Sequence, residues 1–266
     1  MTNNYNCHPR EGGDLNLTED SRLRGNDKPL WLEKLQNKYG ALDAADLLRE
    51  MIKGEFAEKI ALISSFGADA ALLLAMVAEV DASTPILFLE TGKHFPETLE
   101  YVETLKTQLK LTNLHFLTPD PEMLKRIDEK GDLWNANPDR CCWLRKVEPL
   151  DRAVKNLGIE ALITGRKKYQ TSDRAELKTI ELDDKNIFRI NPLANWDKDR
   201  QKAEFANRTL PAHPLLEKGY LSIGCAPCTS IVKVGEDERA GRWRHTAGDD
   251  NAQKTECGLH VSTDKI

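Results

Sequence analysis

Four of the six cysteines in this chain stand in two close pairs, a spacing that suits metal binding. Cys225 and Cys228 form a C-x-x-C motif, in which a turn can direct two thiolates onto one metal centre. Cys141 and Cys142 are adjacent. Together the pairs supply the four thiolates that one tetrahedral zinc ion or one iron–sulfur cluster needs. Because adjacent residues on a helix point about 100° apart, Cys141 and Cys142 suit a compact cluster better than a single small ion.

Cys257 stands alone near the end of the chain, in the sequence KTECGLH. A thiol with the usual pKa of about 8.5 is only partly ionised near pH 7, so a nucleophilic cysteine needs nearby cations. Lys254 and His260 could supply positive charge, whereas Glu256 opposes it. Behind the polar segment AGDDNAQ, such a cysteine could move into a pocket and out again. The motif predicts a mobile nucleophile, and a surface thiol without a role is the alternative.

Alternating apolar and helical patterns predict an α/β fold with a parallel sheet flanked by helices. Continuous apolar runs suit strands that are buried on both faces. Such runs lie at 59–64, 85–90, 113–119 and 160–165, with shorter candidates in IELDD and NIFRINPL. Helical spacing follows at 69–80, 96–110, 121–130, 141–156 and in DKDRQKAEFANRTL. Two further helices, WLEKLQNKY and LDAADLLREMI, are expected to cover one flank of the sheet, the second opened by Asp43 as N-cap.

The loops that follow these strands are the expected binding site, because ligands of open parallel sheets sit beyond the carboxyl ends of the strands. After the first strand, a short loop opens a helix, which aims backbone N–H groups and the helix dipole at a phosphate or sulfate. The candidate residues in the three loops are Ser64, Ser65, Phe66 and Gly67, then Leu89, Glu90, Thr91 and Gly92, then Gly165 and Arg166. An ordinary turn would show the same glycines, so this signal is weak in isolation.

Three more cations are candidates for contact with an anionic ligand. Lys146 follows the cysteine pair within about a turn, and Arg239 and Arg242 in GEDERAGRW are three residues apart, so that a helical turn would place them on one face. The alternative for each is a solvated, charged surface, with Glu236, Asp237 and Glu238 as local partners of the two arginines.

Composition limits the partners and the compartment. A formal net charge of −5 over 266 residues argues against a general nucleic-acid or membrane-surface binder. The apolar runs are shorter than a bilayer span and the N-terminus lacks a secretory signal, so we expect a cytoplasmic protein in which disulfides are disfavoured. We expect three parts: a disordered extension over 1–28, an α/β nucleotide-binding domain over 29–218, and a mobile tail over 219–266.

Eight motifs in a fixed order resemble those of the assimilatory adenylyl-sulfate (APS) and phosphoadenylyl-sulfate (PAPS) reductase family. They are SSFGADAALLL, FLETGKHFPETLEY, CCWLRKVEPL, ITGRKKYQ, INPLANW, HPLLEKGYLSIGCAPCT, GEDERAGRW and ECGLH. The resemblance implies the adenine-nucleotide hydrolase-like (PP-loop) fold. It also implies one 4Fe-4S cluster per chain on Cys141, Cys142, Cys225 and Cys228, the type that generally prefers adenylyl sulfate. Ala70 in place of the last PP-loop serine and Glu90 in place of aspartate leave the phosphate contacts open.

The resemblance implies a reaction as well. The adenosine monophosphate half of the substrate would bind the three loops, and its sulfate end would face Lys146, Arg239, Arg242 and His260. The Cys257 thiolate would attack the sulfur, AMP would leave, and an external thioredoxin would release sulfite from the resulting S-sulfocysteine. The cluster would pin the root of the tail at Cys225 and Cys228 against the helix at Cys141.

Three alternatives are open at this point. The first is reduction of the 3'-phosphorylated substrate. The second is an ATP-pyrophosphatase-type ligase or tRNA-thiolation enzyme on the same fold, against which the altered loop counts. The third is a nucleotide-binding zinc scaffold in which Cys257 is idle. The oligomeric state, a homo-oligomer included, is also open.

Overall fold

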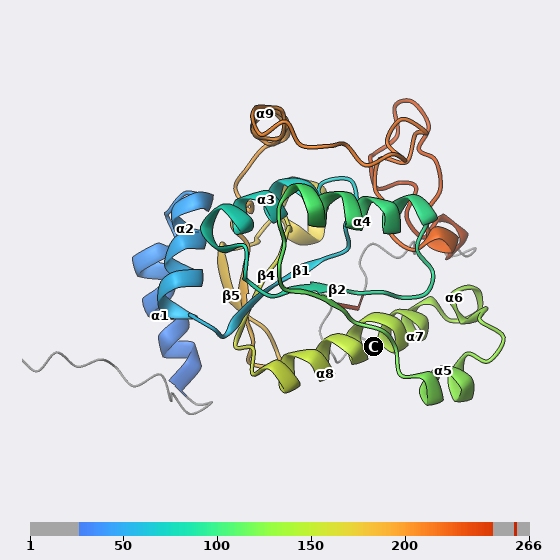
Figure 1. Ribbon diagram of the computed structural model, residues 1–266, viewed down its shortest axis with the longest axis horizontal. Coiled ribbons are helices and arrows are strands. Elements are labelled where there is room, and N and C mark those ends of the chain that lie inside the picture. Colours follow the sequence, from blue (N-terminus) through green and yellow to red (C-terminus); the bar gives the residue numbers. More distant parts are fainter. Residues whose placement is uncertain (1–26, 247–257, 260–266) are drawn as a thin grey trace, which may run out of the picture.

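The computed structural model describes residues 27–246 and 258–259, and in these ranges six strands form one sheet in the order β3-β2-β1-β4-β6-β5 (Figure 1). The strands are β1 Ile60–Ser64, β2 Ile86–Phe88, β3 Leu114–Phe116, β4 Ala161–Ile163, β5 Ile180–Leu182 and β6 Phe188–Ile190. All neighbours pair in parallel except β5 and β6. The predicted parallel sheet is confirmed. Cys257, His260 and the first 26 residues lie outside the described ranges.

The antiparallel edge follows from a short connection. Asp183 accepts hydrogen bonds from the backbone N–H groups of Lys185 and Ile187 at 3.0 and 2.8 Å, which closes a tight turn between β5 and β6. A parallel partner would need a crossover of about a dozen residues or more, which this connection does not provide.

Helices cover both faces of the sheet. The described helices are α1 Lys28–Tyr39, α2 Ala44–Glu50, α3 Ala70–Asp81, α4 Pro96–Gln108, α5 Pro121–Ile127, α6 Leu133–Ala136, α7 Pro138–Cys142, α8 Glu148–Leu157 and α9 Lys198–Asn207. Figure 1 shows α3 and α4 on one face and α7 and α8 on the other. Successive β1 residues accordingly face opposite ways: Leu62 joins the larger apolar core, and Ala61 joins a smaller one that includes Leu150 of α8. No helix within the described ranges is long and apolar enough to cross a membrane.

The N-terminal helices cover a flank of the sheet, as predicted. Trp31 of α1 packs edge-on against Phe188 of β6, with ring centroids 4.7 Å apart. Asp43 is the N-cap residue of α2, as predicted, although its side chain makes no capping hydrogen bond. Its carboxylate instead accepts from Arg200 Nη2 at 2.7 Å, which ties α2 to α9.

The single helix predicted over 141–156 is interrupted. A π-helical turn at Trp143–Val147 separates α7 from α8. Pro149 has no N–H to give to the carbonyl group four residues earlier, so the wider turn falls where a regular helical hydrogen bond is unavailable. The helix predicted to reach residue 130 ends at Ile127, because Asp128 turns inward and accepts from Leu133 N at 2.9 Å.

Candidate functional site

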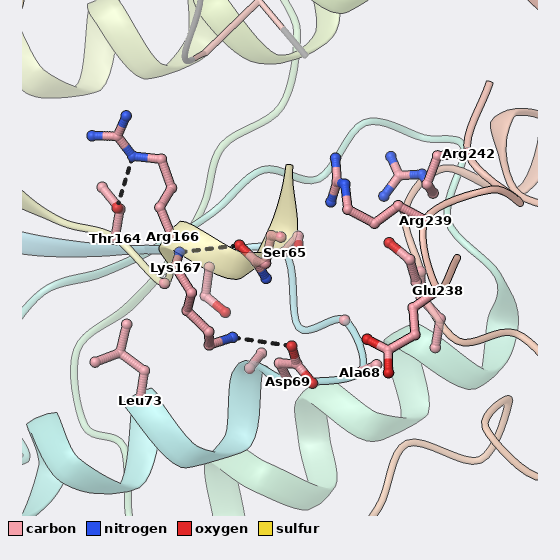
Figure 2. A pocket seen from close by; sticks show the side chains of 18 of the residues that line it. Ser65, Ala68, Asp69, Leu73, Thr164, Arg166, Lys167, Glu238, Arg239 and Arg242 are labelled. Carbon is pink, nitrogen blue, oxygen red and sulfur yellow. Dashed lines mark hydrogen bonds and ion pairs between the residues drawn. The ribbon is translucent and has the colours of Figure 1, made fainter. Parts of the chain in front are cut away.

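One cavity opens at the carboxyl ends of β1 and β4, and it gathers residues from the three predicted strand-end loops and the three predicted cations. Figure 2 shows it from close by, with Lys167 and Asp69 on one side and Arg239 and Arg242 on the other. The predicted site residues that line it are Ser64, Ser65, Gly67, Leu89, Lys146, Gly165, Arg166, Arg239 and Arg242.

The loop after β1 presents its backbone to this cavity. Ser64 Oγ accepts from Phe66 N at 3.1 Å and tightens the turn. Phe66 has a φ of +48°, a left-handed conformation that favours glycine, and its buried ring packs against Phe88 rather than facing the cavity. The N–H groups of Gly67, Ala68 and Asp69 have no hydrogen-bond acceptor in the part of the chain that the structure describes. Such a loop can bind an anion through its backbone.

Gly67 is required in this loop because the backbone of Ile223 passes close to it. A Cβ atom on Gly67 would lie 2.9 Å from the carbonyl oxygen of Ile223, in the segment that crosses over the loop. That segment, from Leu221 to Gly224, also lines the cavity. The C-terminal part of the chain therefore forms one wall of the site, directly against the anion-binding loop.

The walls carry a positive balance. Among the described lining residues, seven are Lys or Arg and three are Asp or Glu. Arg166, the predicted phosphate contact, is already engaged: its Nη2 donates to Glu181 at 2.7 Å and to Asn191 at 3.3 Å. The buried Lys167 faces the loop instead, and its Nζ lies 3.0 Å from Asp69 Oδ2. An anionic ligand therefore suits the cavity, and Lys167, which was not among the predicted contacts, faces the loop after β1.

The loop after β2 is divided between two sites. Leu89 lines the cavity, but Glu90, Thr91 and Gly92 do not. The Glu90 carboxylate accepts from Gly92 N at 2.7 Å and closes the turn. Thr91 is fully buried, with its Oγ1 3.4 Å from Cys225 Sγ. In this structure Thr91 therefore belongs to the surroundings of the cysteines.

The four paired cysteines line a second, smaller cavity beside the first. They are Cys141, Cys142, Cys225 and Cys228, all of them buried free thiols. Lys146 and Trp243 line both cavities, so the two sites share a wall. The cysteine pairs predicted to act together are thus brought together by the fold.

The cysteine environments differ in their effect on ionisation. Burial raises the pKa of Cys141 to about 11 and that of Cys228 to about 12. Burial also acts to raise the pKa of Cys225, but the charge of Lys146, the Thr91 hydroxyl and the charge of Arg242 together bring it below its usual value. Deprotonating all four thiols inside the protein would therefore require the positive charge of a bound metal group.

Four buried thiols can in principle hold a zinc ion or an iron–sulfur cluster. Within the described ranges, no three or more His, Cys, Asp or Glu side chains are arranged to hold a metal ion as they stand. The second cavity offers sulfur donors from two distant segments, with Arg145 and Lys146 beside them. Sulfur ligands with neighbouring cations are the chemistry of an iron–sulfur cluster, and the residues fit that group.

Two of the cavity residues that were not predicted, His94 and Arg174, could take part in chemistry or anion binding. His94 lies in the quoted motif LETGKHFPE, and its Nε2 is 2.8 Å from the carbonyl oxygen of Leu89. A carbonyl can only accept, so Nε2 carries the proton, while Nδ1 is buried with no partner in the described part of the chain. Burial lowers the pKa of His94. Arg174 also lines the cavity, and the only sequence signal for it was its place eight residues after Arg166 in a polar loop.

The end of the described chain returns to the same cavity. Leu259 lines it and packs against the apolar cluster that contains Leu89 and Leu150. Cys257 stands two residues earlier in the sequence, outside the described ranges.

Comparison with known proteins gives concordant results. Residues 59–231 match the model of the phosphoadenosine phosphosulfate reductase domain. A Mesorhizobium japonicum protein named adenosine 5'-phosphosulfate reductase is 46% identical over 224 residues, which cover 84% of this chain and 85% of that protein. The crystal structure of phosphoadenylyl-sulfate reductase from Candida auris, a phosphate complex, matches with a TM-score of 0.64 at 30% identity, over 76% of this chain and 96% of that one. Candida glabrata FMN adenylyltransferase, at 15% identity and a TM-score of 0.50 over 91% and 88% of the two chains, is similar in fold alone.

Proposed function

The chain belongs to the phosphoadenosine phosphosulfate reductase family, and we propose that it reduces adenylyl sulfate to sulfite and AMP in sulfate assimilation. The resemblance drawn from the motifs is confirmed by the family match, and the PP-loop fold is confirmed by the structural neighbours. The relative named for adenosine 5'-phosphosulfate is 46% identical to this chain, and the solved phosphoadenylyl-sulfate reductase is 30% identical. We therefore propose adenylyl sulfate, rather than its 3'-phosphorylated form, as the substrate of this protein.

The proposed reaction is a nucleophilic displacement at sulfur. The Cys257 thiolate attacks the sulfur of the sulfate group, an S–S bond forms, the S–O bond to the phosphate breaks, and AMP leaves. A thiolate of a thioredoxin then attacks the Cys257 sulfur and sulfite departs with the bonding electrons. The second thiol of the thioredoxin resolves the mixed disulfide, so the two electrons come from the donor.

The described residues support separate parts of this reaction. The backbone N–H groups of the loop after β1 are suited to an anionic group of the nucleotide. Lys146, Arg239 and Arg242 line the same cavity and would stabilise the charge that moves toward the leaving phosphate. We assign His260 to the sulfate end as well, as an extension of the sequence prediction.

One observation carries the proposal. A single cavity is lined by the anion-binding loop, by the cations and by Leu259, which follows Cys257 by two residues. A nucleophile in that part of the chain would have an anion-binding site within reach. We therefore propose that Cys257 enters this cavity for the first step and leaves it for the second.

For the second cavity we propose one 4Fe-4S cluster per chain, held by Cys141, Cys142, Cys225 and Cys228. When bound, it supplies a compact anionic centre that joins α7 to the C-x-x-C turn. The side chain of Lys146, which lines both cavities, would lie between this negative charge and the substrate anion. Thioredoxin dependence and free thiols both suit a reducing compartment, for which we propose the cytoplasm.

Mass spectrometry tests the first step directly. Anaerobically purified protein is incubated with adenylyl sulfate and no reductant, then digested and mapped. The proposal predicts one added SO₃ group on Cys257, absent from Cys257→Ser. No addition to an iron-replete sample would contradict it. Parallel incubation with the 3'-phosphorylated substrate decides between the two nucleotides, because the preferred one should modify Cys257 faster.

A further inference from the structure

The guanidinium group of Arg242 occupies a narrow slot between Gly224 and the indole ring of Trp243. Its Cζ lies 4.4 Å from the centre of the ring. A Cβ atom added to Gly224 would lie 2.3 Å from Nη2 and 2.6 Å from Cζ of the same guanidinium group. Real Cβ atoms essentially never come that close to another heavy atom. Only glycine at position 224 leaves room for the guanidinium.

Both walls of the slot are fixed to the C-x-x-C turn. Gly224 directly precedes Cys225, and its N–H donates to Thr229 Oγ1 at 3.2 Å. The backbone N–H of Trp243 donates to the carbonyl oxygen of Cys228 at 3.0 Å. The indole ring of Trp243 packs in one cluster with Cys225 and Cys228. The cysteine turn therefore sets the width and position of the slot.

Arg242 also lines the substrate cavity, while Trp243 lies on the wall that the two cavities share. We propose that Gly224 is a positioning residue, which leaves room beside Trp243 so that the folded C-x-x-C turn holds Arg242 at the anion-binding wall. The inference rests on the proposed function for the nature of the anion, a sulfate or phosphate group of the substrate. A folded C-x-x-C turn would therefore fix the position of the Arg242 guanidinium in the proposed substrate site.

The slot makes an unusual prediction about an added methyl group. At Gly241 a Cβ atom would meet the carbonyl oxygen of Ser230 at 2.2 Å, so the backbone would have to move. At Gly224 the atoms in the way belong to the end of a flexible side chain. Gly224→Ala should therefore displace the Arg242 guanidinium from the slot and leave the fold and the cysteine cavity intact.

A double-mutant cycle tests this inference on the full-length, anaerobically purified protein. Gly224→Ala should lower kcat/KM for adenylyl sulfate by about tenfold or more, through loss of charge-assisted contacts to the substrate anion. Its iron content and visible absorption should match the wild type. In the Arg242→Ala background the same change should cost nothing further, because the group it displaces is gone. Equal losses in both backgrounds, or no loss in the first, would overturn the inference.

A control and a second readout separate this inference from the proposed function. A Cβ atom on Gly54 would meet nothing within 4 Å, so Gly54→Ala is the matched control and should keep wild-type activity. A crystal structure of Gly224→Ala should show the guanidinium outside the slot, whatever reaction the protein catalyses. If the guanidinium is still stacked on Trp243 in that variant, then Gly224 is not needed to position Arg242. Wild-type protein that fails to reduce adenylyl sulfate would instead sink the proposed function.

Discussion

The hydroxyl oxygen of Thr91 lies 3.4 Å from the sulfur of Cys225, across a sequence separation of 134 residues. This contact joins the loop after β2 to the C-x-x-C turn. The same loop places Leu89 in the proposed substrate cavity, so one short segment lines that cavity and also contacts Cys225. Lys93 in this loop accepts a further hydrogen bond at its carbonyl oxygen from Ala226 N at 2.7 Å.

Removing the Thr91 hydroxyl should make the four cysteines hold a metal group less tightly. Thr91→Val keeps the shape of the side chain but removes the donor that, after Lys146, most lowers the pKa of the Cys225 thiol. A hydrogen bond to a charged group contributes about 1.5–3 kcal/mol, so we expect iron to be lost to a chelator about tenfold faster. The visible absorption of the proposed cluster would follow this loss. Thr91→Ser keeps the hydroxyl and should behave like the wild type. Equal rates for valine and wild type would show that the contact does not matter.

Breaking the buried ion pair between Arg145 and Asp128 should destabilise the protein strongly. Arg145 Nη2 lies 2.5 Å from Asp128 Oδ2, and the two side chains are 7% and 0% exposed. Asp128→Asn leaves the guanidinium charge buried without its counter-ion, so the free energy of unfolding should fall by about 3 kcal/mol. Urea denaturation measures it. Asp46→Asn removes the exposed partner of Arg49 and should cost under about 1 kcal/mol. Similar losses for both variants would contradict the expected role of burial.

His213 should make the protein less stable in mild acid. The side chain is fully buried, its Nδ1 accepts from Leu215 N at 3.1 Å, and its Nε2 lies 3.1 Å from Thr98 Oγ1. Burial lowers the pKa of His213 from 6.5 to about 4. Between these values the unfolded chain binds a proton that the folded chain does not. The free energy of unfolding should therefore fall as pH falls, by up to about 1.4 kcal/mol per pH unit, with no contribution above pH 6.5.

Urea denaturation at several pH values between 7.5 and 4 measures this slope. His213→Gln cannot take up the proton, so the part of the slope due to this residue should disappear while other groups keep theirs. A variant with the wild-type slope would show that His213 is not the titrating group.

The strands could be predicted because burial on both faces leaves a plain signature of continuous apolar residues. Leu62 and Ala61 are adjacent and both buried, in different cores on opposite faces of β1. The antiparallel β5 and the π-helical turn before α8 have no such signature. The first depends on how Asp183 closes a turn, and the second on a proline within a helix.

The site was partly readable for a similar reason. Cysteine pairs and glycine-containing loops carry their chemistry in their residue types, and the fold brings them to neighbouring cavities. The direction of a side chain within a turn is decided by its neighbours, so the sequence could not show that Thr91 faces Cys225. Nor could it show that Gly224 lies against Arg242, because that approach depends on the pairing of Thr229 with Arg242.

Leu259 offers a test of how the last described residues are held at the proposed substrate cavity. Its side chain packs against the apolar cluster of Leu89 and Leu150, beside the predicted anion site. Leu259→Ala removes part of this apolar contact, and at about 25 cal/mol per Å² the loss is on the order of 1 kcal/mol. We expect Cys257 to acquire its SO₃ group about fivefold more slowly, in single-turnover experiments without reductant.

Affinity for AMP, measured by calorimetry, should be unchanged in Leu259→Ala, since the loop after β1 is untouched. Leu99→Ala is the matched control, because Leu99 is an exposed leucine of α4 that does not line the cavity. It should react at the wild-type rate. If Leu259→Ala also reacts at that rate, then the contact between Leu259 and the apolar cluster does not help to bring the nucleophile to the substrate. If AMP affinity falls together with the rate, the leucine shapes the nucleotide site itself.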